Sequence, residues 1–286
     1  MNIKFNDYKL LCNKGSATFN EDVVGLSPYG AWVIDGATGL NGKNLISNES
    51  DAKWYVNWWN KYLHDNLSKD ESLKEIVKNG IYEISKEYHK LIGDNKIEPI
   101  DFPSSACSII KFYKDKIEYL ILGDCTLLVS KDENVTTYKD DAISLLDKSV
   151  FDYIDSLEDI KSMSFNEKKS KAMHIIINNR LKKNTIGGYW SLEFSKEAVE
   201  NSINGFIEVD DDMKIMMASD GFSCAYDRYN LFTKEEMFSV AQNQGIDYIY
   251  KKLREIEMSD ENGVQYTRFK VHDDSSCIYL DIYKNN

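Results

Sequence analysis

The chain has few prolines, few cysteines and no long hydrophobic run, and each of these absences excludes a class of structure. Only three prolines occur in 286 residues, and no repeat or low-complexity tract marks a linker between domains. The five cysteines form no CxxC pair, which argues against structural zinc and against a disulfide framework. Nowhere do about 18 apolar residues run together, and the first residues lack the apolar core of a signal peptide. We therefore expect one domain over residues 1–286, a cytoplasmic location and no membrane contact.

Positive charge is also in short supply. The sequence has 47 acidic and 35 basic residues, and its formal net charge is −12. The electrostatic field of a protein with this net charge repels nucleic-acid backbones, so we expect no nucleic-acid partner. It also repels a phosphorylated substrate, unless bound cations reverse the sign locally. The hydrophobic fraction of 42% is enough for a folded core.

Strand and helix patterns occur in blocks along the chain. Strands are predicted at 29–35, 104–113, 116–123, 125–130, 206–209, 213–218 and 275–283. Helical patterns are predicted at 51–67, 70–92, 142–183 and 234–257. Blocks of this kind, without strict alternation of strand and helix, favour an antiparallel sheet core with helices packed outside it.

Aspartates stand where several of these strands begin or end. The phrases VIDGATG (33–39) and MMASDGFS (216–223) are apolar runs that stop at an Asp-Gly pair. In HDDSSCIYL (272–280) the carboxylates come first and the apolar run follows. Strands that begin or end in this way can deliver several carboxylates to one end of a sheet. A glycine beside the aspartate also allows its carbonyl to approach an ion closely.

Taken singly, an Asp-Gly pair is more often a turn than a ligand. Three such acids, Asp35, Asp220 and Asp273, together with the NED triplet at 20–22, favour a ligand role over separate turns. A site of carboxylates, a carbonyl and waters suits Mg²⁺ or Mn²⁺ better than zinc. The pattern therefore indicates metal-assisted hydrolysis.

Six phrases resemble, in their order, the motifs of the metal-dependent (PPM, type 2C) protein serine/threonine phosphatases. They are NEDVVG, VIDGATG, PSSACSIIKFY, LGDCTLLV, MMASDGFS and HDDSSCIYL, and they span about Asn20 to Tyr283. Bacterial-type members look most similar, because the inserts are short. The resemblance implies an α/β (α+β) fold, a four-layer α-β-β-α sandwich of two mainly antiparallel sheets flanked by helices. It also implies Mn²⁺- or Mg²⁺-dependent hydrolysis of phosphoserine and phosphothreonine on proteins, by a water that two metal ions activate.

The resemblance assigns ligands by position. Asp35 would bridge the two metal ions, and the carbonyl of Gly36 would ligate one of them. Asp220 and Asp273 would complete the other site.

Three further acids match family motifs less simply. Glu21 and Asp22 match an acidic pair that binds or orients metal-bound water. Asp124 matches an acid that sometimes ligates a third ion, but a Gly-Asp pair between LIL and TLLV is equally good as a hairpin turn.

Departures from the family pattern concern the substrate more than the metals. Ala17 stands where the family usually carries a phosphate-binding arginine, and Lys14 is the nearby candidate for that contact. A lysine lacks the bidentate fork of arginine. Ala37 stands where eukaryotic members place a histidine proposed as general acid, and Thr38 stands where a glycine is expected.

Two alternatives to a protein phosphatase stay open. In the first, the chain is a catalytically weak or inactive regulatory member of the same fold. In the second, it is a hydrolase of a small phosphorylated metabolite. We expect a phosphorylated protein as the partner, and we expect the protein to be a monomer.

The lysine-rich segment 168–183 predicts a charged helix face, from which Arg180 or Lys182 could meet a phosphorylated substrate. His272 is the one histidine with a route to the predicted site.

Overall fold

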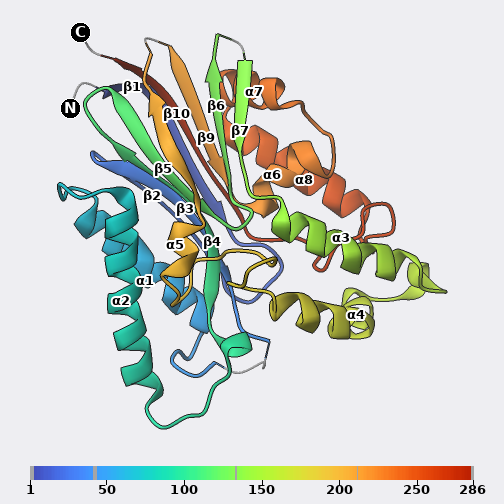
Figure 1. Ribbon diagram of the computed structural model, residues 1–286. Helices are drawn as coiled ribbons and strands as arrows, with labels where there is room; N and C mark the ends of the chain where they lie inside the picture. The colour runs from blue at the N-terminus through green and yellow to red at the C-terminus, as the bar shows by residue number, and fades with distance from the viewer. Residues whose placement is uncertain (1–2, 41–43, 133, 211, 285–286) are drawn as a thin grey trace.

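Two antiparallel sheets stacked face to face form the centre of the protein, and a computed structural model describes residues 3–40, 44–132, 134–210 and 212–284 (Figure 1). The first sheet contains, in spatial order, β1 (Ile3–Asn13), β10 (Ser275–Lys284), β9 (Met213–Ala218), β6 (Thr126–Lys131) and β7 (Asn134–Tyr138). The second contains β2 (Asp22–Ser27), β3 (Gly30–Ala37), β4 (Ser104–Phe112), β5 (Lys116–Leu122) and β8 (Ile203–Glu208). All pairings between these strands are antiparallel.

The central strands are buried on both faces, which explains their nearly continuous apolar sequences. Every residue of β4 is buried. In β3, Val33 faces the opposite sheet, whereas Trp32 and Ile34 pack on the helix side. A strand covered on both faces needs apolar residues at successive positions, so a simple alternation of apolar and polar residues is lost.

Helices cover the outer face of each sheet. The second sheet is covered by α1 (Asp51–Asn66) and α2 (Leu73–Ile92). The first sheet is covered by α6 (Asp220–Asp227), α7 (Lys234–Gln244) and α8 (Ile246–Ser259). The layers therefore follow the order α-β-β-α, which confirms the predicted sandwich (Figure 1). Over the described ranges, every helix falls short of the length or the apolar content that crossing a bilayer requires.

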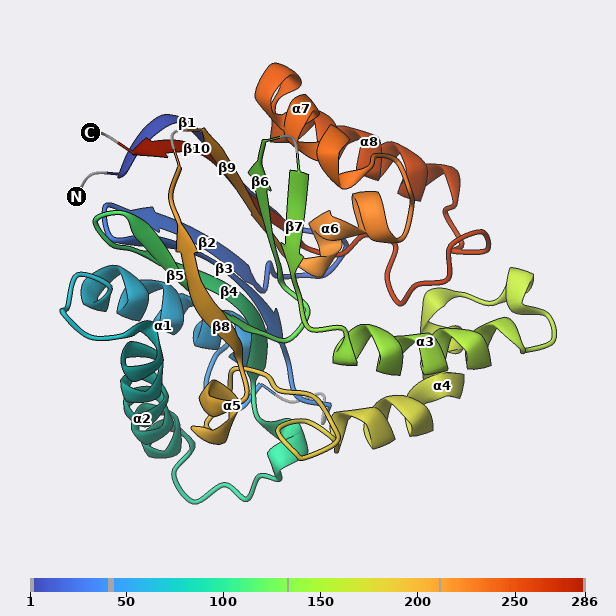
Figure 2. The same ribbon diagram turned by 45° about the horizontal axis from the view of Figure 1, so that its top comes forward.

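A pair of helices stands beside these layers, near one end of the sheets (Figure 2). The pair consists of α3 (Ala142–Asp155) and α4 (Phe165–Arg180), which pack through a small cluster of their own around Val150, Ile154 and Ala172. Phe269, in the loop before β10, packs against this cluster. The remaining short elements are α5 (Glu197–Glu200) and 3-10 turns at Pro99–Asp101 and Ile160–Ser162.

The structure corrects the sequence prediction at several places. The sequence prediction missed β1, β2 and β7; all three lie at sheet edges, where polar residues obscure the strand pattern. The helix predicted over 234–257 is two helices, because Gly245, with φ of +88°, separates them. The hairpin reading of Asp124 is wrong: β5 and β6 belong to different sheets, so Gly123 and Asp124 carry the chain from one sheet to the other.

Two leucines of α2 offer a test of which helix face packs on the sheet. Leu73 is 0% exposed and Leu91 is 49% exposed. Leu73→Ala should lower the free energy of unfolding by about 2–5 kcal/mol, because it leaves a cavity in the core. Leu91→Ala should change it by less than about 0.5 kcal/mol. Chemical denaturation of both variants checks this, and equal losses would contradict the packing described.

Candidate functional site

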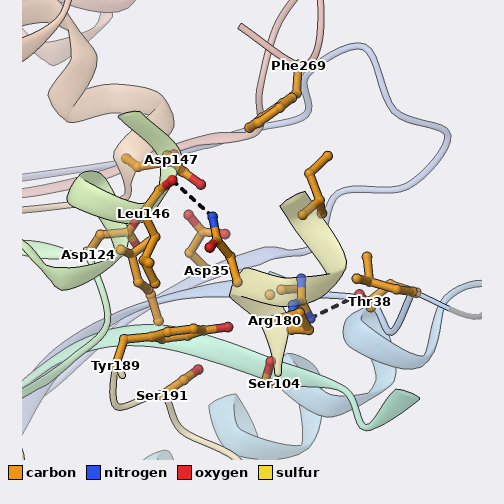
Figure 3. A pocket seen from close by; sticks show the side chains of 18 of the residues that line it. Asp35, Thr38, Ser104, Asp124, Leu146, Asp147, Arg180, Tyr189, Ser191 and Phe269 are labelled. Carbon is orange, nitrogen blue, oxygen red and sulfur yellow. Dashed lines mark hydrogen bonds between the residues drawn. The ribbon is translucent and has the colours of Figure 1, made fainter. Parts of the chain in front are cut away.

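A cavity of about 470 Å³ lies at the end of the two sheets, next to α3 and α4 (Figure 3). Its acidic lining comes from segments that are far apart in the sequence: Glu21, Asp35, Asp124, Asp147, Asp220 and Asp273. Four of the predicted metal ligands, Asp35, Asp124, Asp220 and Asp273, are thus brought to one cavity. Gly36, the predicted carbonyl ligand, also lines it.

The register of β2 against β3 positions the first group of acids. Asp22 is the direct cross-strand partner of Asp35. One step further, the N–H of Gly36 donates to the carbonyl of Glu21 at 3.0 Å. A Cβ at Gly36 would lie only 2.5 Å from that carbonyl oxygen, so a glycine is required for this close approach. Glu21 and Asp22 are therefore held beside Asp35.

The second group of acids depends on the pairing of β9 with β10. Asp220 follows β9 and is the first residue of α6, while Asp273 precedes β10. The N–H of Ser219 donates to the carbonyl of Ser276, and the N–H of Ser276 donates to Oγ of Ser219, both at 3.0 Å. These bonds tie the end of β9 to the beginning of β10, so Asp220 and Asp273 meet at the same end of the sheet.

The carboxylates at this end of the sheets disfavour one another's charge. Burial raises the pKa of Asp22 to about 8 and that of Asp124 to about 8. Burial, followed by the charges of Asp22 and Asp220, raises the pKa of Asp35 well above its ordinary value. Burial and then Asp220 raise the pKa of Asp147 to about 6. Without cations, the group therefore retains protons that isolated aspartates would lose near pH 4.

This arrangement fits hydrated divalent cations. No histidine or cysteine is among the described residues that line the cavity, so the donors are oxygens, as Mg²⁺ and Mn²⁺ prefer. Within the described ranges, no three His, Cys, Asp or Glu side chains are close enough to surround an ion by themselves. Mg²⁺ usually binds through one or two carboxylates and keeps several waters, so a looser group of carboxylates is compatible with it. Oδ2 of Asp22 is buried and finds no hydrogen-bond donor in the described part of the chain.

One cation already lies among these acids. Nζ of Lys270 is 2.6 Å from Oδ1 of Asp273. Burial opposes its charge, but Asp273, Asp35 and Asp220 outweigh burial and raise the pKa of Lys270. Lys270 therefore remains charged and neutralises part of the acidic group.

Glu21 is held by two hydroxyl groups. Thr38 Oγ1 donates to Glu21 Oε1 at 2.7 Å, and the Ser50 hydroxyl donates to the same oxygen. Ser50 is also the N-cap of α1, where it accepts from the N–H of Lys53. Thr38 occurs where the family pattern has a glycine, and here its side chain fixes an acid of the site. Ser50 was not among the site residues that the sequence predicted.

The two aspartates of the HDDSS phrase have different surroundings. Asp273 faces the cavity, whereas Asp274 is buried. The carboxylate of Asp274 accepts from the N–H of Gly15 and from the N–H of Glu21, each at 2.7 Å. Asp274 thus joins the loop after β1 and the start of β2 to the start of β10.

Of the basic residues that the sequence suggested, Arg180 lines the cavity, and Lys14, Lys182 and His272 are absent from the described lining. Lys14 is exposed, donates to the carbonyl of Thr18 at 3.3 Å and does not line the cavity, so its contact with phosphate stays a prediction. His272 does not line the cavity either, and its Nδ1 lies 3.1 Å from Oε2 of Glu257. Arg180 does line it, as do Lys169 and Lys270, which were not among the predicted site residues.

The raised pKa values predict how stability depends on pH. The folded chain binds more protons at Asp22 and Asp124 than the unfolded chain does between about pH 4 and pH 8, so stability falls as pH rises through this range. In EDTA, Asp124→Asn should raise the melting temperature at pH 7.5 by on the order of 5 °C. It should change little at pH 4.5.

A neutral substitution at the exposed Asp212, whose side chain is 78% exposed, serves as the control. Thermal melts of the two variants and the parent at several pH values give the comparison. The same pH slope in the Asp124 variant and the parent would contradict the raised pKa.

No protein-family model and no curated protein matches the chain by sequence, whereas solved structures match it over almost their whole length. The Mycobacterium tuberculosis serine/threonine phosphatase PstP/Ppp has a TM-score of 0.59 at 14% identity, with 98% of each chain covered. The catalytic domain of PstP in complex with two manganese ions has a TM-score of 0.57 at 15% identity, with 99% of each chain covered. Stp1 from Staphylococcus aureus has a TM-score of 0.55 at 10% identity, covering 97% of this chain and 95% of that one. The chain therefore has the fold of these bacterial serine/threonine phosphatases, the fold that the resemblance implied.

Proposed function

We propose that the protein is a phosphatase that depends on Mn²⁺ or Mg²⁺ and hydrolyses phosphoserine and phosphothreonine on proteins. The observation that carries the proposal is the convergence of Asp35, Asp124, Asp220 and Asp273 on one cavity. These acids come from both sheets, at the end where the chain passes between them. A phosphatase structure with the same fold contains two manganese ions, which supports the choice of metal.

Asp35, the Gly36 carbonyl, Asp220 and Asp273 would hold two ions, and Asp124 would contribute to a third. When bound, such ions supply an activated water as nucleophile and neutralise charge on the phosphoryl oxygens. The protein's part is to hold the oxygen donors in a rigid frame. The bonds of Gly36 to Glu21 and of Ser219 to Ser276 provide that frame.

Glu21 is suited to orient a water in the cavity. Its Oε1 accepts from Thr38 and Ser50, while Oε2 accepts no hydrogen bond from the described residues. A carboxylate that is fixed at one oxygen can offer the other to a water or to a substrate hydroxyl.

A cysteine nucleophile does not fit this site. Burial raises the pKa of Cys107 to about 12 and that of Cys125 well above its ordinary value. The thiolate is the reactive form of cysteine, so these side chains stay inert. Hydrolysis by water is the chemistry that the remaining groups support.

A small phosphorylated metabolite is the second candidate substrate. The observation in its favour is the position of α3 and α4, whose side chains Ile143, Leu146 and Ile176 form one wall of the cavity. Such a wall would admit a small phosphoester more readily than a folded protein.

The metal mechanism predicts the effect of Asp35→Asn. This variant should lose more than about 100-fold of the Mn²⁺-dependent hydrolysis of an aryl phosphate, because a ligand charge is lost. Asp212→Asn, at an exposed site, is the matched control and should keep full activity. EDTA should abolish the activity of the parent. Hydrolysis that survives both EDTA and the Asp35 substitution would refute the metal mechanism.

Side-by-side turnover of phosphoserine peptides and small phosphoesters separates the two substrate classes. A protein phosphatase should show the higher kcat/KM on the peptides. The regulatory, non-catalytic alternative predicts no turnover of either class, and calorimetric titration with Mn²⁺ then tells whether the site still binds metal.

A further inference from the structure

Three cationic side chains line the same cavity as the acids. Lys169 and Arg180 come from α4, and Lys270 comes from the loop before β10. Lys169 and Arg180 are separated by about three helical turns, so they lie on the same face of α4. Figure 3 shows Arg180, at the end of α4, in the same cavity as Asp35, Asp124 and Asp147.

These cations are not equally neutralised. Lys270 has an ion pair with Asp273 at 2.6 Å. In the part of the chain that the structure describes, neither Lys169 nor Arg180 has a carboxylate within ion-pair distance. The guanidinium of Arg180 contacts the carbonyl of Thr38 at 3.5 Å, a long hydrogen bond that leaves most of its donors available.

The electrostatic consequence is visible at Lys169. Burial lowers the pKa of its ammonium group, and the positive charges of Lys270 and Arg180 lower it further. An anion placed among the three side chains would relieve both effects. The acids that line the cavity, which form its acidic floor, do not neutralise these charges, because none of them lies within ion-pair distance of Lys169 or Arg180.

We propose that Arg180 and Lys169 bind the phosphate group of the substrate, a phosphate monoester dianion held between α4 and the acidic floor of the cavity. This proposal rests on the proposed phosphatase function and names the phosphate contacts of that site. It assigns to α4 the role that an arginine at the position of Ala17 would have. Lys14, the candidate near Ala17, is exposed and lies outside the cavity lining.

Arg180 is the stronger of the two contacts. A guanidinium presents two parallel N–H groups to the oxygens of one phosphate, whereas an ammonium acts as a point charge. Loss of a charged hydrogen bond of this kind corresponds to a 10- to 100-fold change in affinity, approximately. We expect a smaller loss at Lys169.

Binding of inorganic phosphate to the Mg²⁺-loaded protein, measured by calorimetry, tests the proposal without requiring turnover. Arg180→Gln should weaken phosphate binding by about 10- to 100-fold. Arg180→Lys should fall between this variant and the parent. Lys169→Gln should weaken binding about tenfold or less. Lys171→Gln, at an exposed position of α4 outside the cavity lining, is the matched control and should bind as the parent does.

Mg²⁺ titration of every variant reports whether the fold and the acidic floor are intact, and each variant should bind Mg²⁺ as the parent does. Unchanged phosphate affinity in both Arg180→Gln and Lys169→Gln would overturn the proposal, and so would a loss confined to Lys14→Gln. Phosphate binding that depends on Arg180 in a protein without turnover would support this site and overturn the proposed function. Turnover with an unchanged KM in Arg180→Gln would support the proposed function and overturn this phosphate site.

Discussion

The buried carboxylates at the cavity end of the two sheets repel one another, and the surrounding structure holds them together against that repulsion. Asp22, Asp35, Asp124 and Asp220 are removed from water and placed near one another, and in each of them burial raises the pKa before neighbouring charges raise it further. A second negative charge costs more than the first in surroundings of low dielectric. Protons, the ammonium of Lys270 and divalent ions are the three ways to offset that cost. The rest of the site can be understood as the means of holding the acids in place and supplying cations.

The frame that holds the acids consists mainly of backbone hydrogen bonds between neighbouring strands. Register sets Asp22 opposite Asp35, and the close approach of Gly36 to the Glu21 carbonyl fixes the strand ends. Asp274 adds a link between the sheets, since its carboxylate receives the N–H of Glu21. An acid on a flexible loop would move away from its neighbours, whereas Asp22 and Asp35 cannot separate without breaking the pairing of β2 with β3. Stored repulsion of this kind favours any cation that enters.

The sequence was informative where function coincides with a strand end. Asp35, Asp220 and Asp273 could be predicted because an apolar run marks each strand and the acid stands at its limit. Their convergence followed from the order of motifs, since no local pattern says which strands become neighbours. Thr38 counted as a departure from the family pattern, but its hydroxyl bonds to Glu21, together with Ser50 at the start of α1. These contacts join residues that are distant in sequence: the pairing of β2 with β3 brings Thr38 to Glu21, and the packing of α1 against β2 brings Ser50 there.

Asp147, Lys169 and Arg180 lie on helices whose polar faces look, in sequence, like surfaces turned to water. What decides their role is the placement of α3 and α4 beside the cavity, and this pair of helices is held by a small apolar cluster of its own. Cations supplied from α4 make anion binding depend on the position of that helix. An anion between α4 and the acidic floor stabilises the arrangement in which the helix borders the cavity, and by the same linkage a shift of α4 weakens the anion's binding. A site with its arginine in the loop after β1 has no such dependence, because that loop is tied to the sheets by Asp274. With Ala17 in that loop, the proposed binding of phosphate by Arg180 depends on where α4 lies.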